Sequence, residues 1–312
     1  MDMLIPAYVN PKAGSAQRAL AALAQAPGFD VRQVSAGDLP TLLQREIAEG
    51  TPRVLVAGGD GTLARAASTL AGTTVALSVL PGGTLNHFAR DHGIPLDPTE
   101  ALALAVGGAV APADVGYVNA QLFLNTSSVG AYTRYVRTRE LIEPALGYWV
   151  GSVAAGVRVL LTLHHIPVVL AVDGATRTYE APFVFVGVQE RGLGFPGLGQ
   201  PMPRGARGLH VVVPRGRRQA RRFARALARL DRNLPERPPS PGVDEAMVHE
   251  LSVGLRGRRV EVALDGELRE LAAPLEYRFA PAALRIVTSP AGGPLGPARP
   301  RHHQKAPPSR KL

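Results

Sequence analysis

The sequence predicts an α/β N-terminal domain with a mostly parallel sheet, followed by a β-rich, sandwich-like second domain. Over the first 118 residues, apolar strands alternate with helical segments, a pattern typical of a parallel sheet covered on both faces. From about residue 119, strand-like runs follow one another with few helices between them. The chain has 312 residues, of which 46% are hydrophobic, so it can bury the cores of two domains.

The first half of the chain divides into alternating strands and helices. We expect strands at 3–9, 31–35, 53–57, 75–80 and 110–117, and helices at 15–26, 38–49, 62–71, 85–91 and 98–106. Ligands bind to parallel sheets at the carboxyl ends of the strands, where the connecting loops gather. A binding site is therefore expected in the loops that follow these strands.

The second half consists of predicted strands joined by turns. Runs such as "AQLFLNTSSVG" and "RRVEVALDG" are interrupted by two expected helices, around 134–163 and 216–231. We expect a first domain at 1–118, completed by a returning strand within 276–290, and a second domain at 119–275. Residues 291–312 are rich in Pro, Gly and Arg, a composition typical of a disordered tail.

The composition favours a cytoplasmic protein. No cysteine is present, which excludes disulfides and cysteine zinc sites and is usual in the cytosol. The N-terminus lacks the basic start and long apolar run of a signal peptide. The most apolar stretch, 146–163, is interrupted by Arg158 and is shorter than the roughly 20 residues of a membrane span. We expect it to form a buried or surface-seated helix.

The net charge of +10 is concentrated in two segments. Residues 204–237 hold 11 arginines and two acids, and the tail 291–312 holds five basic residues and no acid. Such segments are typical of proteins with an anionic partner, and a solubilising surface is the simpler alternative. The helix expected at 215–232 has arginines opposite an apolar face, and we expect the arginines to steer the protein to an anionic membrane surface. No nucleic-acid-binding motif accompanies the charge, so no nucleic acid is expected; a homodimer is left open.

A glycine-rich loop, "GGDGT", follows the strand expected at 53–57. Glycines between a strand and a helix let backbone N–H groups approach phosphates, and Asp60 would add a carboxylate for Mg²⁺. The alternative is a tight turn in which Asp60 caps a helix.

Two further loops of this kind support the nucleotide interpretation. "PGGTLN" follows the next strand, and "VNPKAGSA" follows the first strand. Convergence of three such loops at one sheet edge is hard to explain as unrelated turns, and no Walker A pattern is present.

These motifs, in this order, resemble the diacylglycerol kinase family of lipid kinases. The resemblance rests on "VNPKAG", "GGDGT" and "LPGGTLNHFARDHGIP", continues through "ADVGYVNAQLFLNTSSVGAY" and ends with "VALDGE". "GGDGT" is shared with NAD kinases, whereas the Gly-Thr-x-Asn loop and the late Asp-Gly-Glu favour the lipid-kinase branch. The resemblance implies two domains with ATP in the cleft between them, Mg²⁺, and a lipid substrate.

The resemblance also implies roles for single residues. The nucleotide site would be lined by Asn10, Gly58, Gly59, Asp60, Gly61, Thr62, Gly83, Thr84 and Asn86. Asp60 and Asp114 would belong to a carboxylate and water network around Mg²⁺. Asp265 would be the general base on the lipid hydroxyl, and Glu267 would assist at the metal or phosphate.

A second Asp-Gly hairpin and several departures from the family pattern bear on these roles. Asp173 also precedes a glycine but lacks an acid two residues later, which favours Asp265. Where many members carry Asn-Glu and Asp, this chain has Ala64, Arg65 and His87. Asp91 lies one turn beyond His87 and could compensate for the missing carboxylate. Two alternatives therefore stay open: a kinase of a soluble acceptor such as NAD, and a non-catalytic nucleotide-binding regulatory protein.

Overall fold

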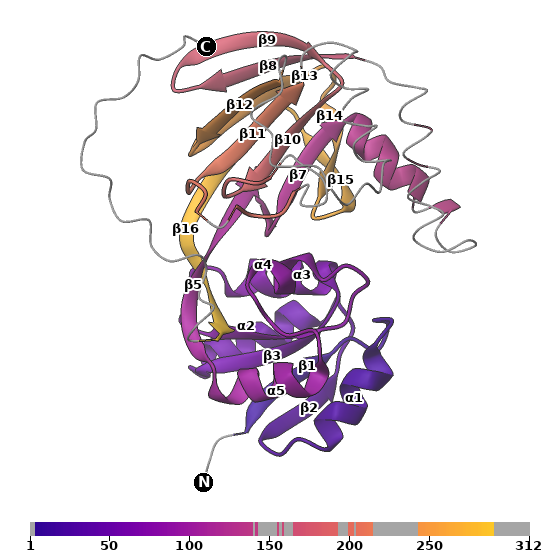
Figure 1. Ribbon diagram of the computed structural model, residues 1–312, viewed down its shortest axis with the longest axis vertical. Helices are drawn as coiled ribbons and strands as arrows, with labels where there is room; N and C mark the ends of the chain where they lie inside the picture. The colour runs from indigo at the N-terminus through magenta and orange to yellow at the C-terminus, as the bar shows by residue number, and fades with distance from the viewer. Residues whose placement is uncertain are drawn as a thin grey trace, which may run out of the picture.

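The computed structural model shows the two halves of the chain one above the other (Figure 1). It describes residues 4–139, 141–142, 155, 158, 165–192, 199–202, 204–214 and 243–289. Four segments of the sequence lie wholly or mostly outside the described residues: the apolar stretch 146–163, the glycine-rich loop 192–197, the basic segment 215–232 and the tail 291–312. No helix in the described part of the chain is both long and apolar enough to cross a membrane.

The N-terminal half has the predicted alternation of strands and helices. Its elements are β1 (Ile5–Val9), α1 (Ala16–Ala24), β2 (Phe29–Gln33), α2 (Leu39–Ala48), β3 (Arg53–Gly58), α3 (Asp60–Leu70), β4 (Ala76–Pro81), α4 (His87–Asp91), α5 (Pro98–Gly107) and β5 (Ala109–Val118). Strands β2, β1, β3 and β4 are parallel and adjacent in that order.

Two helix starts differ from the prediction by two residues. Helix α3 begins at Asp60, two residues earlier than expected, with extended Gly59 before it; an acid in the first turn of a helix is stabilised by the helix dipole. Helix α4 begins only at His87, because Asn86 has the left-handed φ of 51°.

Helices cover both faces of the parallel sheet. Val54 and Val56 of β3 point to the face covered by α2 and α3, whereas Leu55 and Ala57 point to the face covered by α1 and α5. This alternation follows from the two-residue period of a strand. Both faces are apolar, so the functional groups of this half are confined to the loops at the ends of the strands.

The second half is antiparallel. Its strands are β6 (Gln121–Phe123), β7 (Thr126–Gly130), β8 (Ile166–Val172), β9 (Ala175–Ala181), β10 (Phe183–Val188), β11 (Leu209–Pro214), β12 (Val243–Val248), β13 (Glu250–Leu255), β14 (Arg259–Leu264), β15 (Glu267–Ala272) and β16 (Leu275–Thr288). Six of them form a separate sheet in the order β12-β11-β10-β7-β14-β15. The strands β13, β8 and β9 instead extend the sheet of the N-terminal half. A shared apolar core lies between the two sheets.

Strand β16 runs through both halves. It pairs antiparallel with β5 over most of its length and parallel with β4 near its end. Leu275 and Tyr277 pack into the core between the two sheets, whereas Leu284 and Ile286 pack into the core of the N-terminal half. The final strand therefore belongs to both halves, and the domain boundary at residue 118 stays a prediction.

We expect Tyr8→Phe to destabilise the N-terminal half. The buried Tyr8 hydroxyl donates to Glu46 Oε1 at 2.5 Å, and Thr51 donates to the other carboxylate oxygen at 2.6 Å. Removing one donor from a buried carboxylate costs about 1–3 kcal/mol of unfolding free energy. Urea unfolding measures this loss, and Tyr117→Phe, at a half-buried ring over which Arg278 lies, serves as the control. Equal stability of the two variants would contradict the role of this buried hydrogen bond.

Candidate active site

Three βα loops meet at the carboxyl end of the parallel sheet. The backbone N–H of Gly82 donates to the carbonyl of Gly58 at 2.8 Å. A Cβ on Gly83 would lie 2.9 Å from the Cα of Gly59, and one on Gly82 would lie 3.0 Å from Ser15 Oγ. The glycines are therefore needed because one loop backbone lies directly against the next.

Side chains within these loops bind one another. Asn10 Nδ2 donates to Thr62 Oγ1 at 3.0 Å, which joins the first loop to helix α3. Asn86 accepts from the N–H of Gly83 and donates to its carbonyl, both at 2.8 Å. In this state Asn10, Thr62 and Asn86 hold the loops in shape. Thr84, by contrast, is exposed at the tip of its loop.

Asp60 connects two of the loops. Its carboxylate accepts the backbone N–H groups of His87 and Phe88, each at 3.3 Å, at the start of α4. It makes no side-chain capping bond to its own helix α3. Asp60 thus caps α4 and not α3, the helix that the sequence suggested. Both hydrogen bonds to α4 are long, so the carboxylate can still bind a further partner.

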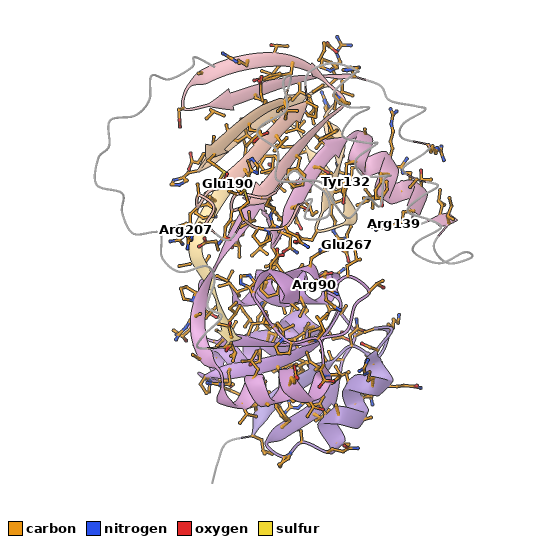
Figure 2. The ribbon with its side chains drawn as sticks, in the orientation of Figure 1. Arg90, Tyr132, Arg139, Glu190, Arg207 and Glu267 are labelled. Atoms are coloured by element: carbon orange, nitrogen blue, oxygen red, sulfur yellow. The ribbon has the colours of Figure 1, made fainter. Side chains whose placement is uncertain are left out.

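Glu267 reaches this junction from the second half. A Cβ on Gly61 would lie 1.9 Å from Glu267 Oε1, so the carboxylate lies directly against the first turn of α3. Its other oxygen accepts from Arg269 at 2.6 Å. Figure 2 shows Glu267 at the boundary between the halves, above the helices of the N-terminal half. The structure therefore brings the Asp-Gly-Glu turn to the GGDGT loop.

Asp265 occupies the tight turn between β14 and β15, with a φ of 47° followed by 85° at Gly266. Its carboxylate accepts three backbone N–H groups, from Leu124 and Asn125 at 2.7 Å and from Thr126 at 3.0 Å. Burial raises the pKa of Asp265, and these three hydrogen bonds only partly oppose the effect. Sequence reasoning missed this bonding, because the donors lie about 140 residues earlier in the chain.

The competing hairpin lies elsewhere. Asp173 is exposed in the turn between β8 and β9, which form the far edge of the larger sheet (Figure 1). Strand β9 has no further strand beyond it among the described residues. Asp265, and not Asp173, therefore lies in the turn that Glu267 brings to the GGDGT loop, and its role as the base stays a prediction.

Asp114, which is expected to share a Mg²⁺ network with Asp60, is bound by donors of the protein itself. The buried carboxylate of Asp114 is bound by Arg207, by Gln189 Nε2 at 3.1 Å and by the N–H of Ala282 at 2.8 Å. Among the described residues no group of three or more His, Asp or Glu side chains could hold a metal. In this structure protein donors fill the acceptor sites of Asp114, and its place in a Mg²⁺ network with Asp60 stays a prediction.

Asp91, which could compensate for His87, is bound by an arginine of the second half. Its carboxylate pairs with Arg191 at 3.0 Å, and both side chains are at least nine-tenths buried. Burial raises the pKa of Asp91, against the opposing charge of Arg191. Arg191 also donates to the carbonyls of Val188 and Gly199, so this ion pair fixes a loop of the second half onto α4.

Sequence reasoning missed three arginines at the boundary between the halves. Arg191 and Arg207 bind Asp91 and Asp114, and Arg139 donates to the carbonyl of Gly266 at 3.2 Å, in the turn between Asp265 and Glu267. Nothing in the local sequence distinguishes them from the other arginines of this basic chain.

Comparisons with known proteins agree with the motifs. The model of the diacylglycerol kinase catalytic domain matches residues 7–118. A Pseudomonas aeruginosa (strain UCBPP-PA14) protein named "Probable lipid kinase YegS-like" is 33% identical over 284 residues, which cover 83% of this chain and 83% of that protein. The chain belongs to the diacylglycerol kinase family of lipid kinases.

Other relatives match a part of the chain or its fold. A Pseudomonas putida protein of the same name is 41% identical over 123 residues, which cover 38% of this chain and 41% of that protein. The crystal structure of a diacylglycerol kinase from Bacillus anthracis covers 93% of this chain and 98% of its own. It superposes with a TM-score of 0.67 at 22% identity, which supports the fold.

We expect Gly83→Ala to weaken nucleotide binding. The added Cβ would approach the Cα of Gly59 to 2.9 Å, and neither backbone can move without separating the loops. The affinity for ATP should fall at least about tenfold, which corresponds to a loss of roughly 1.4 kcal/mol of binding free energy. Calorimetric titration measures it. Gly107→Ala is the matched control, since its Cβ would meet no atom within 4 Å; an equal effect in both variants would argue against a loop contact.

We expect His92 to make stability fall between pH 6.5 and pH 4. Burial lowers the pKa of His92 to about 4, which Arg191 reinforces and Asp114 opposes. Below about pH 6.5 His92 takes up a proton in the unfolded chain but stays neutral in the folded protein. The free energy of unfolding therefore decreases as the pH falls. The contribution is at most about 3 kcal/mol.

Thermal unfolding across this pH range measures the effect. His92→Phe should flatten the pH dependence, whereas His249→Gln, at an exposed histidine, should leave it as in the wild type. An unchanged slope in His92→Phe would show that other groups cause the acid loss.

Proposed function

We propose that this protein is an ATP- and Mg²⁺-dependent kinase that transfers the γ-phosphate to a lipid hydroxyl of diacylglycerol-like or sphingoid-like type. The observation that carries the proposal is the contact of Glu267 with Gly61, which puts the Asp-Gly-Glu turn of one half against the nucleotide loop of the other. Membership of the lipid kinase family supports the reaction class.

The GGDGT loop at the start of α3 has the features of a phosphate-binding site. Gly58 and Gly59 precede α3, and Gly61 lies in its first turn, so backbone can approach the phosphates at the positive end of an 11-residue helix. Asp60 and Glu267 offer two carboxylates at the same helix end. They fit Mg²⁺, which takes one or two carboxylates together with phosphate oxygens and waters. When bound, the ion would neutralise charge on the phosphates.

Asp265 has the geometry of a held base. Three N–H donors fill three of the roughly four acceptor sites of its carboxylate, which leaves one on Oδ2 for the acceptor hydroxyl. In the proposed step the hydroxyl oxygen bonds to the γ-phosphorus, the bond between the β- and γ-phosphates breaks, and ADP leaves. The hydroxyl proton passes to Asp265. The raised pKa of Asp265 favours this uptake.

The charge of the chain supports an encounter with a membrane surface. The net charge of +10 favours binding to anionic lipid, and we propose that the protein works as a peripheral protein on the cytoplasmic leaflet. Sedimentation with anionic vesicles tests this: binding should weaken with salt, and equal binding to neutral vesicles would contradict it.

We expect Asp265→Asn to lower phosphate transfer at least about 100-fold, the usual contribution of an acid–base group. Glu267→Gln should also lower transfer strongly, because it removes one of the two carboxylates of the proposed Mg²⁺ site. The assay measures label passing from γ-labelled ATP, with Mg²⁺, to a total lipid extract. Asp173→Asn is the matched control, because it makes the same change in the remote Asp-Gly hairpin and should retain full activity.

Folding and binding separate the possible outcomes. An asparagine at 265 would point an NH₂ group at backbone donors, so its unfolding temperature is measured alongside, and Glu267→Gln carries the test if Asp265→Asn unfolds. Labelled NAD in place of lipid would show a soluble acceptor. Tight nucleotide binding without transfer to any acceptor would favour a regulatory protein.

A further inference from the structure

Asp114 lies where the two halves of the chain join. It belongs to β5, opposite the irregular part of β16, and its side chain is only 5% exposed. Figure 2 shows Arg207, its partner, beside the crossing of β5 and β16. Because a buried charge is costly unless it is paired, this carboxylate requires a cation or strong donors.

The donors around Asp114 fill every acceptor site of its carboxylate. Oδ1 accepts from Arg207 Nη2 at 2.5 Å and from the N–H of Ala282 at 2.8 Å. Oδ2 accepts from Arg207 Nε at 2.9 Å and from Gln189 Nε2 at 3.1 Å. A carboxylate has about four acceptor sites, two on each oxygen, so no site is left for a metal ion.

The backbone is shaped to supply these donors. Ala282 and Gln189 both have left-handed φ values, 53° and 63°, which side-chain-bearing residues adopt only when their surroundings impose it. Ala282 lies in the bulge of β16 that turns its N–H toward Asp114. The arginine adds two parallel bonds, the geometry in which guanidinium binds carboxylate best.

We propose that Arg207 is a built-in cation that takes the place of a metal ion at Asp114 and joins the two halves of the protein without one. A divalent ion is then required only where Glu267 meets the GGDGT loop, at Asp60 and Glu267. The hydrogen bonds from Arg207, Ala282 and Gln189 outweigh burial and lower the pKa of Asp114, which agrees with a carboxylate that stays ionised. This inference does not depend on the acceptor of the kinase, because its test measures stability and metal binding in the absence of nucleotide.

The test is thermal unfolding of chelator-treated full-length protein, with and without Mg²⁺ or Ca²⁺ and without nucleotide. Arg207→Ala should lower the unfolding temperature by at least about 3 °C, as expected when a buried charge loses its partner, and a divalent ion should restore part of the loss. The control is Arg204→Ala, which removes the same charge at an exposed position three residues earlier. Equal unfolding temperatures for the two variants would overturn the proposal.

Two further variants test whether the charge of Arg207 excludes the metal. Arg207→Lys keeps the charge but not the paired bonds, and should lose stability without becoming responsive to metal. Arg207→Asp puts a second carboxylate beside Asp114, and its unfolding temperature should rise with added Ca²⁺. Indifference of Arg207→Asp to Ca²⁺ and Mg²⁺ would count against a cation site at this position.

Two asparagine variants, compared with the wild type, decide which of the two carboxylates binds a metal ion. Any stabilisation by Mg²⁺ should persist in Asp114→Asn and disappear in Asp60→Asn, which would support the proposal. Stabilisation that is lost only in Asp114→Asn would show that a metal displaces Arg207, and would overturn it. Calorimetric titration with Mg²⁺ alone tests the same point, because it measures how many ions each variant binds.

Discussion

The antiparallel pairing of β5 with β16 is the constraint on which the rest of the structure depends. The two strands pair from Tyr277 to Ala280 and again from Leu284 to Thr288, so a ladder with one bulge passes from one core to the other. Since hydrogen-bonded strands cannot slide without breaking the whole ladder, this pairing sets how the second half sits over the three glycine loops. The contact between Glu267 and Gly61 is a consequence of that placement.

Charged groups reinforce the junction at two further points. The ion pairs Arg191–Asp91 and Arg207–Asp114 both join a loop of the second half to the first, and three of the four side chains are at least nine-tenths buried. Pairs of this kind add less stability than apolar packing would, but each strongly penalises an arrangement that leaves one partner alone. They therefore act mainly to specify one relative position of the halves. A kinase gains from this, because phosphoryl transfer depends on positioning more than on covalent chemistry by the protein.

The sequence predicted the elements well and the partners poorly, for one physical reason. Strand and helix alternation, the three glycine loops and the Asp-Gly turn at Asp265 are local patterns, and the structure contains all of them. The partner of Asp114 is 93 residues away in the chain, and the donors to Asp265 are about 140 residues away. No periodicity encodes such pairings. The expectation for Asp114 considered only Mg²⁺ as its partner, because the arginine that binds this carboxylate lies in a loop far along the chain.

In the proposed mechanism, Asp265 both holds the fold and acts as the base. Its three backbone bonds fix the chain that leads from β6 into β7, and the same bonds fix the carboxylate itself. A base held in this way needs no reorganisation when a hydroxyl approaches, which is the condition under which electrostatic catalysis is strongest. The cost of burying the carboxylate appears as its raised pKa, and a base of higher pKa accepts a proton more readily. The burial that penalises the folded carboxylate therefore also prepares it for the proposed reaction.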